Sequence, residues 1–357
     1  MTTATHFFLG ANSGQGFQNL FDRFCAPEDH YDLAVLKGGP GVGKSTLMAK
    51  LGAAMEARGE AVEYLHCSGD PDSLDGVYIP RLRAAMVDGT APHVVEPKYP
   101  AAADRYVNLG TFYDIAQAKR DRDAIVGFTQ ACSAAYQRAY RALGAARQLS
   151  DSAAALVWDV VDQQKLLKRA DGIIARELRG RGEGGPDSFR FLGSVTCKGE
   201  IWRFDSVEAL CPRVYQLQDS FGLADLMLQR IRAAAGARGF RSIVCLDPEH
   251  PQRIHHLLLP ELGTAFVTSR EGMELPGGAY RRVRLDAMAP AAAVKEHKSR
   301  LRFIRRMAAA LRQEGVDALA EAKASHDRLE AVYRPYVDFA GVDQIAAQEI
   351  ARFESYL

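Results

Sequence analysis

Short apolar runs alternate with one amphipathic segment through the first third of the chain. The run Asp32–Lys37 (DLAVLK) predicts a buried strand. Residues 45–58 carry apolar side chains at helical spacing and stop before a glycine, which predicts a helix. Further strands are expected at Ala61–His66 and Arg83–Val87. Because strands and helices alternate through short loops, we expect an α/β fold built on a parallel sheet.

The pattern changes at residues 113–180, which are rich in Ala, Arg, Gln and Leu. Two or more long helices are expected there, and they can form a hairpin. A glycine-rich stretch, Gly180–Ser188 (GRGEGGPDS), then predicts a linker. Another helical stretch is expected from about Ala291 to the end of the chain.

The sequence after the linker repeats features of the sequence before it. Phe-Leu-Gly at residues 8–10 recurs at 191–193, and Ala-Arg-Gly at 57–59 recurs at 237–239. The second pair fixes an offset of 180, which also matches prolines and apolar positions without a gap. We therefore expect a tandem duplication of an α/β core, each copy followed by a helical appendage. The expected segments are a first core at 1–112, its appendage at 113–180, a second core at 181–290 and its appendage at 291–357.

A glycine-rich turn between the first expected strand and helix carries the clearest chemical signal. It fits G-x-x-x-x-G-K-[ST], the P-loop that wraps phosphates with backbone N–H groups at a helix start. Lys44 is expected to reach the β- and γ-phosphates, and the Ser45 hydroxyl to be one Mg²⁺ ligand. The residues expected to bind the nucleotide are Gly38, Gly39, Pro40, Gly41, Val42, Gly43, Lys44, Ser45 and Thr46. The sequence therefore predicts a P-loop NTPase-type core that binds a nucleoside triphosphate with Mg²⁺.

Acidic residues near the expected strand ends are candidates for metal binding and catalysis. Asp88 follows the strand at 83–87 and is expected to support Mg²⁺, although Asp-Gly is also a common turn pair. Asp70, Asp72 and Asp75 lie in a polar loop after the strand that ends at His66. One of the three is expected to accept a proton or orient a water, and helix capping is the alternative. His93 is a weaker candidate for the same site.

The second core lacks these groups at the repeat offset. Residues 218–225 match the P-loop, but Ala224 replaces Lys44 and Asp225 replaces Ser45. Asp219 adds a second carboxylate, so we expect a pseudo-domain that binds no triphosphate. Three histidines, at 250, 255 and 256, suggest a metal site, but without a spaced acidic or cysteine partner a polar loop is favoured.

Charge and composition narrow the expected partners. The chain has 45 basic and 44 acidic side chains, which gives no support for nucleic acid or an anionic membrane. No apolar stretch is long enough to span a bilayer, and the N-terminus does not resemble a signal peptide. Six scattered cysteines are expected to be packed thiols in a reducing compartment, so the cytoplasm is the expected location.

Several segments resemble a family of bacterial tandem P-loop ATP-binding proteins of largely unassigned function. The resemblance covers most of the chain, and its most specific part is H-C-S-G-D-P-D-S-L-D-G at residues 66–76. The other resembling segments are F-F-L-G-A-N-S-G-Q-G-F (7–17), K-G-G-P-G-V-G-K-S-T-L-M (37–48), D-G-T-A-P-H (88–93) and P-K-Y-P (97–100). The resemblance implies ATP binding and hydrolysis. Family members commonly carry a P-loop in both halves, and this chain departs from that pattern at residues 218–225.

These observations favour an ATPase with one active site that works with a small molecule or protein partner. A small-molecule kinase is the alternative, and a nucleotide sensor with little hydrolysis is a third. ATP is the expected nucleotide because no N-K-x-D-type guanine motif appears, but no adenine pocket can be recognised in the sequence, so the choice between adenine and guanine stays open. A duplicated chain can act as a monomeric pseudo-dimer or form a homodimer.

Overall fold

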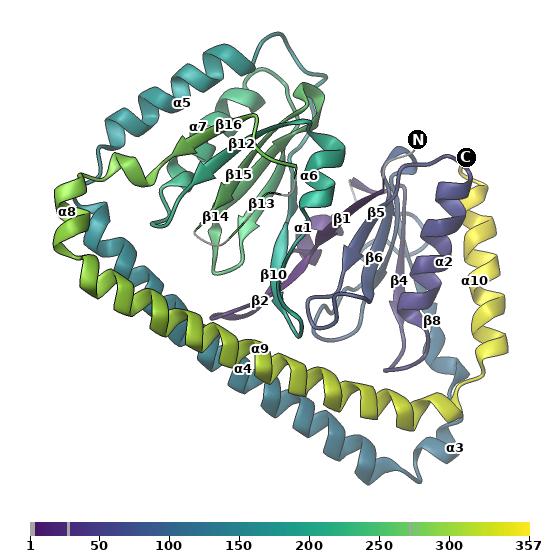
Figure 1. Ribbon diagram of the computed structural model, residues 1–357. Helices are drawn as coiled ribbons and strands as arrows, with labels where there is room; N and C mark the ends of the chain where they lie inside the picture. The colour runs from purple at the N-terminus through teal and green to yellow at the C-terminus, as the bar shows by residue number, and fades with distance from the viewer. Residues whose placement is uncertain (1–3, 27–28, 271–272, 274, 276) are drawn as a thin grey trace.

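Two α/β cores stand side by side above a long pair of helices that spans both (Figure 1). The computed structural model describes residues 4–26, 29–270, 273, 275 and 277–357. The first core contains β1 (Thr5–Phe8), β2 (Gly10–Ser13), β3 (Gly16–Asn19), α1 (Phe21–Phe24), β4 (Asp32–Lys37), α2 (Lys44–Ala57), β5 (Glu63–His66), β6 (Leu74–Ile79), β7 (Ala84–Asp88) and β8 (Asp104–Asn108). The second contains β9 (Ser188–Arg190), β10 (Gly193–Thr196), β11 (Gly199–Trp202), α6 (Phe204–Leu210), β12 (Arg213–Gln218), α7 (Ala224–Gly236), β13 (Ile243–Asp247), β14 (His250–Leu259), β15 (Thr264–Ser269) and β16 (Arg281–Arg284).

The main sheet of the first core is mixed, so the expectation of a parallel sheet is wrong in part. Within the described residues its strand order is β1-β5-β6-β7-β4-β8. The pairs β1–β5, β7–β4 and β4–β8 are parallel, whereas β6 runs antiparallel to both of its neighbours. The sequence interpretation placed residues 66–75 in one polar loop. Instead, a tight turn folds β6 back on β5, because Cys67 N donates to Ser73 O at 3.0 Å and Ser73 N to Asp70 O at 2.9 Å.

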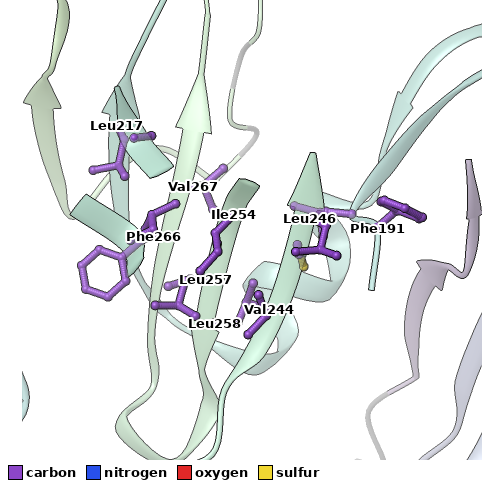
Figure 2. Packing of buried hydrophobic residues seen from close by; sticks show 14 of the residues in the cluster. Phe191, Leu217, Val244, Leu246, Ile254, Leu257, Leu258, Phe266 and Val267 are labelled. Carbon is purple, nitrogen blue, oxygen red and sulfur yellow. The ribbon is translucent and has the colours of Figure 1, made fainter. Parts of the chain in front are cut away.

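The main sheet of the second core has the corresponding strand order. Among the described residues it reads β9-β13-β14-β15-β12-β16, with the same sequence of parallel and antiparallel pairs. The helices α2 and α7 begin 180 residues apart, as do β5 and β13. The side chains of its inner strands pack into a continuous apolar core (Figure 2).

A small third sheet joins the two halves. Its strand order is β11-β10-β2-β3, so one hairpin comes from each core. The join is the Asn12–Val195 pair, where Asn12 Nδ2 donates to Val195 O at 2.9 Å and to Ser68 O at 3.0 Å. Phe8 and Phe191 exchange backbone hydrogen bonds beside it. The halves are therefore connected through backbone pairing as well as through side-chain packing.

The long helices pair between the halves rather than within one appendage. The helices of the two appendages are α3 (Ile115–Ala118), α4 (Arg122–Trp158), α5 (Gln163–Glu177), α8 (Ala291–Glu296), α9 (Lys298–Tyr333) and α10 (Phe339–Glu354). A hairpin within residues 113–180 is not formed, because α4 packs antiparallel along α9 (Figure 1). Small residues permit this close packing: Gly315 of α9 faces Leu143 of α4, where a Cβ would lie 2.7 Å from the leucine side chain.

The terminal helix of each appendage covers the core of the other half. α10 packs on α2, and Lys50 pairs with Asp343 at 2.7 Å across that contact. α5 packs on α7 in the same way, with Arg230 and Asp171 paired at 2.5 Å. The first core is thus completed by a helix from the other end of the chain, and the second by the helix that precedes it in the sequence.

The histidines of the second core lie in a strand and not in a loop, whereas the cysteines are free thiols as expected. The histidines at 250, 255 and 256 were expected in a polar loop, but they lie on β14, and His256 is fully buried. Its Nδ1 accepts a hydrogen bond from Thr268 N at 3.1 Å, and burial lowers the pKa of the ring well below its usual value. The cysteines have no disulfide partner in the structure; Cys25, Cys211 and Cys245 are buried, and the other three are partly buried.

Candidate functional site

The glycine-rich turn leaves β4 and enters α2 in a conformation that needs its glycines. Gly41 has φ of +74° and Gly43 has φ of +92°, in the left-handed region that side chains disfavour. Gly43 caps α2, which begins at Lys44. The loop therefore presents backbone N–H groups and the positive end of the helix dipole at one point.

Lys44 folds back over the loop. Its Nζ donates to Gly38 O at 2.6 Å and to Gly39 O at 3.2 Å, and lies 3.5 Å from Asp88 Oδ2. The side chains of Lys44 and Asp88 are each 13% exposed. A cation at this depth, at the start of a helix, is suited to hold a phosphate group.

Asp88 lies beside this lysine, and Ser45 follows it in the chain. Asp88 is the last residue of β7, and its Oδ1 accepts hydrogen bonds from Thr90 N at 2.8 Å and Thr90 Oγ1 at 2.6 Å. Ser45 Oγ accepts from Leu74 N at 2.9 Å, which leaves its hydroxyl hydrogen available. Thr46, the next residue, is exposed at the helix surface.

Of the three loop carboxylates, Asp75 is the one placed beside Asp88. It precedes Gly76, which pairs with Val87 across β6 and β7, so Asp75 lies opposite Asp88. Asp75 Oδ2 is 3.2 Å from His93 Nε2, and both side chains are buried. Burial of the ring works against protonation, but the negative charges of Asp75 and Asp88 raise the pKa of His93 above its ordinary value. The rings of Phe17 and Phe21 pack on His93 and exclude water from it.

Asp70 and Asp72 have structural contacts instead. Asp70 Oδ2 accepts from Ser73 Oγ at 3.1 Å and lies 3.3 Å from Lys323 Nζ on α9. Asp72 is exposed and forms an ion pair with Lys198 from the β10–β11 turn, which lowers its pKa. Both carboxylates therefore connect the β5–β6 turn to the second half. The Cys67 thiol is partly buried, and burial raises its pKa.

Sequence reasoning missed two residues at the loop, Glu330 from the second half and Tyr113 from the first. Glu330, near the end of α9, has its Oε1 3.3 Å from Gly41 N and accepts a hydrogen bond from it. Tyr113 donates from its hydroxyl to Pro40 O at 2.7 Å, and its ring packs against Tyr333. A pocket of about 330 Å³ opens beside these rings. It is lined by Gly39, Gly110, Tyr113, Ile115, Ala118, Lys119, Arg122, Ile125, Val126 and Tyr333.

The corresponding loop of the second core is already satisfied by its own carboxylates. Asp219 Oδ1 accepts from Phe221 N at 3.0 Å, and its Oδ2 accepts from Ala224 N at 2.7 Å. Asp225 makes a different contact, because its Oδ1 accepts from Ile254 N at 2.8 Å. Trp158, at the end of α4, donates to Phe221 O at 2.9 Å. A carboxylate thus occupies the backbone donors that a phosphate would need.

Comparisons with protein families, with curated proteins and with solved structures find no match for this chain. No helix within the described residues is both long and apolar enough to cross a membrane.

Proposed function

We propose that the first half binds Mg²⁺–ATP at residues 38–46 and hydrolyses it, with the second half as a pseudo-domain. The observation that carries the proposal is the placement of Lys44. Its ammonium lies between the open glycine-rich turn and Asp88, at 3.5 Å from the carboxylate. A buried cation, a helix start and an adjacent carboxylate are the parts that phosphoryl chemistry requires.

The side chains present fit a magnesium ion that is also held by phosphate and water. Asp88 and the Ser45 hydroxyl would hold it, since Mg²⁺ binds through one or two protein oxygens and keeps several waters. When bound, the ion supplies charge neutralisation at the phosphate oxygens.

We assign Asp75 as the residue that orients water or accepts its proton. Its carboxylate lies opposite Asp88 and is oriented by His93 at 3.2 Å. Asp70 and Asp72 are engaged by Lys323 and Lys198, so they support the turn and do not act on the nucleotide. Water is excluded on the far side by the aromatic rings that cover His93.

A small-molecule kinase is the second candidate, because the pocket beside Gly39 offers room for a phosphoryl acceptor. The same phosphate-binding groups serve both reactions, and the two differ in what accepts the γ-phosphate. The contact from Glu330 to Gly41 favours the ATPase, since it links the loop to a helix that reaches the other core.

ATP turnover with Mg²⁺ tests the proposal, with wild type measured beside Lys44→Ala, Asp75→Asn and the matched control Asp72→Asn. We expect Lys44→Ala and Asp75→Asn to lose turnover by about 100-fold or more, and Asp72→Asn to keep it. Far-ultraviolet circular dichroism checks that each variant is folded. Unchanged turnover in folded Lys44→Ala would overturn the assignment.

A second arm adds a pooled metabolite extract to each reaction. Turnover that appears only with extract, depends on Lys44 and yields an isolated phosphorylated product would replace the ATPase by the kinase. Turnover without extract supports hydrolysis.

A further inference from the structure

The most uneven charge distribution in the chain lies at residues 281–306, which we name the basic segment. It contains nine Arg and Lys side chains and two acidic ones, a net charge of +7. Since the whole chain carries +1, the remaining residues together carry −6. The balanced total, which gave no support for a polyanionic partner, conceals this local excess.

The fold places these cations at one end of the long helix pair. The basic segment runs from the edge strand β16 through α8 into the first turns of α9 (Figure 1). Its apolar side chains, such as Leu301 and Ile304, are buried in the main core. Its basic side chains are all exposed: Arg281, Arg282, Arg284, Lys295, Lys298, Arg300, Arg302, Arg305 and Arg306.

Most of these cations have no carboxylate partner, unlike many basic residues elsewhere. Surface pairs such as Arg230–Asp171, Arg138–Glu321 and Arg241–Glu261 neutralise charge at other places. Within the part of the chain that the structure describes, no ion pair is found for eight of the nine: Arg281, Arg282, Arg284, Lys295, Lys298, Arg300, Arg302 and Arg306. Arg282 donates to the neutral side chain of Gln216 at 3.1 Å. This surface therefore presents uncompensated positive charge.

Two exposed aromatic rings lie among the arginines. Phe303 is 52% exposed, with the Arg306 guanidinium 6.0 Å from its ring centroid. Tyr280 is 47% exposed, with Arg281 at 5.2 Å. Exposed rings beside arginine are the groups on which unpaired bases stack.

We propose that the basic segment binds single-stranded nucleic acid. Lys298, Arg302 and Arg306 follow one stripe of α9, about 6 Å apart along the axis, and would contact successive phosphates. Arginine outnumbers lysine in the segment, and its planar fork suits phosphate oxygens. Phe303 adds a stacking surface beside the stripe. An anionic membrane fits less well, because the apolar face of this part of α9 is packed into the core and cannot insert.

Fluorescence anisotropy with a labelled oligothymidylate tests the proposal on the full chain. The variants are Arg302→Glu/Arg306→Glu and Phe303→Ala. The matched control is Arg141→Glu/Arg328→Glu, which makes the same charge change at exposed positions elsewhere on the helix pair. We expect the first double variant to weaken binding at least 10-fold and to reduce the salt dependence by about 0.7 per lost phosphate contact. Phe303→Ala should weaken binding several-fold, and the control should bind like wild type.

Three outcomes would overturn the proposal. They are no binding by wild type at low salt, equal losses in the matched control, and binding to phosphatidylglycerol vesicles with none to the oligonucleotide. The last would assign the surface to a membrane. Because these measurements need no nucleotide hydrolysis, their result does not depend on whether the ATPase proposal is correct.

Discussion

The loops at residues 38–45 and 218–225 occupy the same place in two sheets of the same strand order, yet their chemistry is opposite. In the first, Gly41 and Gly43 adopt left-handed conformations, and Lys44 brings positive charge to the loop. In the second, Asp219 supplies the negative charge from within the chain and accepts from those donors. The comparison teaches that the same backbone frame can be bonded by a carboxylate of the chain itself, at Asp219, or carry a glycine at the corresponding position, Gly39.

The two loops also have one equivalent hydrogen bond, made by a serine in the first and by an aspartate in the second. Ser45 accepts from Leu74 N, and Asp225 accepts from Ile254 N, at positions related by the offset of 180. This hydrogen bond fixes the first turn of the helix to the neighbouring antiparallel strand. An aspartate therefore satisfies the structural role of Ser45 but brings a charge that repels phosphate.

The largest expected effect follows from exchanging these two residues. Ser45→Asp should keep the fold, because aspartate makes the same bond at 225, and should lower ATP affinity by about 100-fold or more through charge repulsion. Calorimetric titration with Mg²⁺–ATP measures the affinity, and thermal unfolding measures the fold. The reciprocal Asp225→Ser is the control, and it should bind one nucleotide like the wild type. Two nucleotides bound per chain, in this variant or in wild type, would refute the pseudo-domain.

A smaller effect, on stability, is expected from removing the Asp219 carboxylate from the second loop. Asp219→Ala leaves the buried N–H groups of Phe221 and Ala224 without their acceptor, at a cost of about 2–4 kcal/mol in the free energy of unfolding. Denaturant titration measures that change. Asp171→Ala removes a carboxylate from an exposed pair with Arg230 and should change the stability much less, because solvent screens the pair. Equal losses in both variants would mean that Asp219 does not hold the loop.

The halves also differ in the turns that follow β5 and β13. Glu249 lies in the second of these turns, 180 residues after Gly69 in the first. Glu249 Oε2 accepts from Gly14 N at 3.0 Å, and burial raises the pKa of its carboxyl to about 7. The native state therefore holds a proton that the unfolded chain has released, so stability falls as pH rises between about 4.5 and 7. Glu249→Gln should raise stability by on the order of 1–3 kcal/mol at pH 8 and change it little at pH 4. Thermal unfolding across that range measures both, and a gain that is the same at every pH would contradict the assignment.

Local sequence pattern predicted the elements that depend on neighbouring residues. The strand at 32–37, the helix after it and the position of Asp88 at a strand end could all be predicted, since each rests on a short apolar run and its boundary. The direction of β6 could not, because it depends on the hydrogen-bonded turn at residues 67–73. For the same reason, sequence alone did not distinguish Asp75 from Asp70.

Pairings between distant segments were beyond sequence reasoning. The helix faces of α4, α5 and α9 are all amphipathic and rich in small residues, so periodicity does not say which two meet. Glu330 lies 289 residues from Gly41, and nothing in its neighbourhood indicates a phosphate loop. The repeat offset was the one long-range signal, and it related Ser45 and Leu74 to Asp225 and Ile254.

The smallest expected effect concerns Glu330, which places a carboxylate at the open loop as Asp219 does at the closed one. The contact is weaker, since a single oxygen lies 3.3 Å from Gly41 N and the side chain is partly exposed. Its neighbour His326 has a pKa raised to about 9 by Cys132 and by Glu330, so the ring is charged at neutral pH. Glu330→Gln keeps an acceptor for Gly41 and removes a negative charge beside the expected phosphates. ATP affinity should therefore rise by about 3- to 10-fold, measured by calorimetry, whereas Glu314→Gln on the same helix should leave it unchanged. A loss of affinity in Glu330→Gln would mean that the carboxylate organises the loop for nucleotide, and the likeness between Glu330 and Asp219 would then fail.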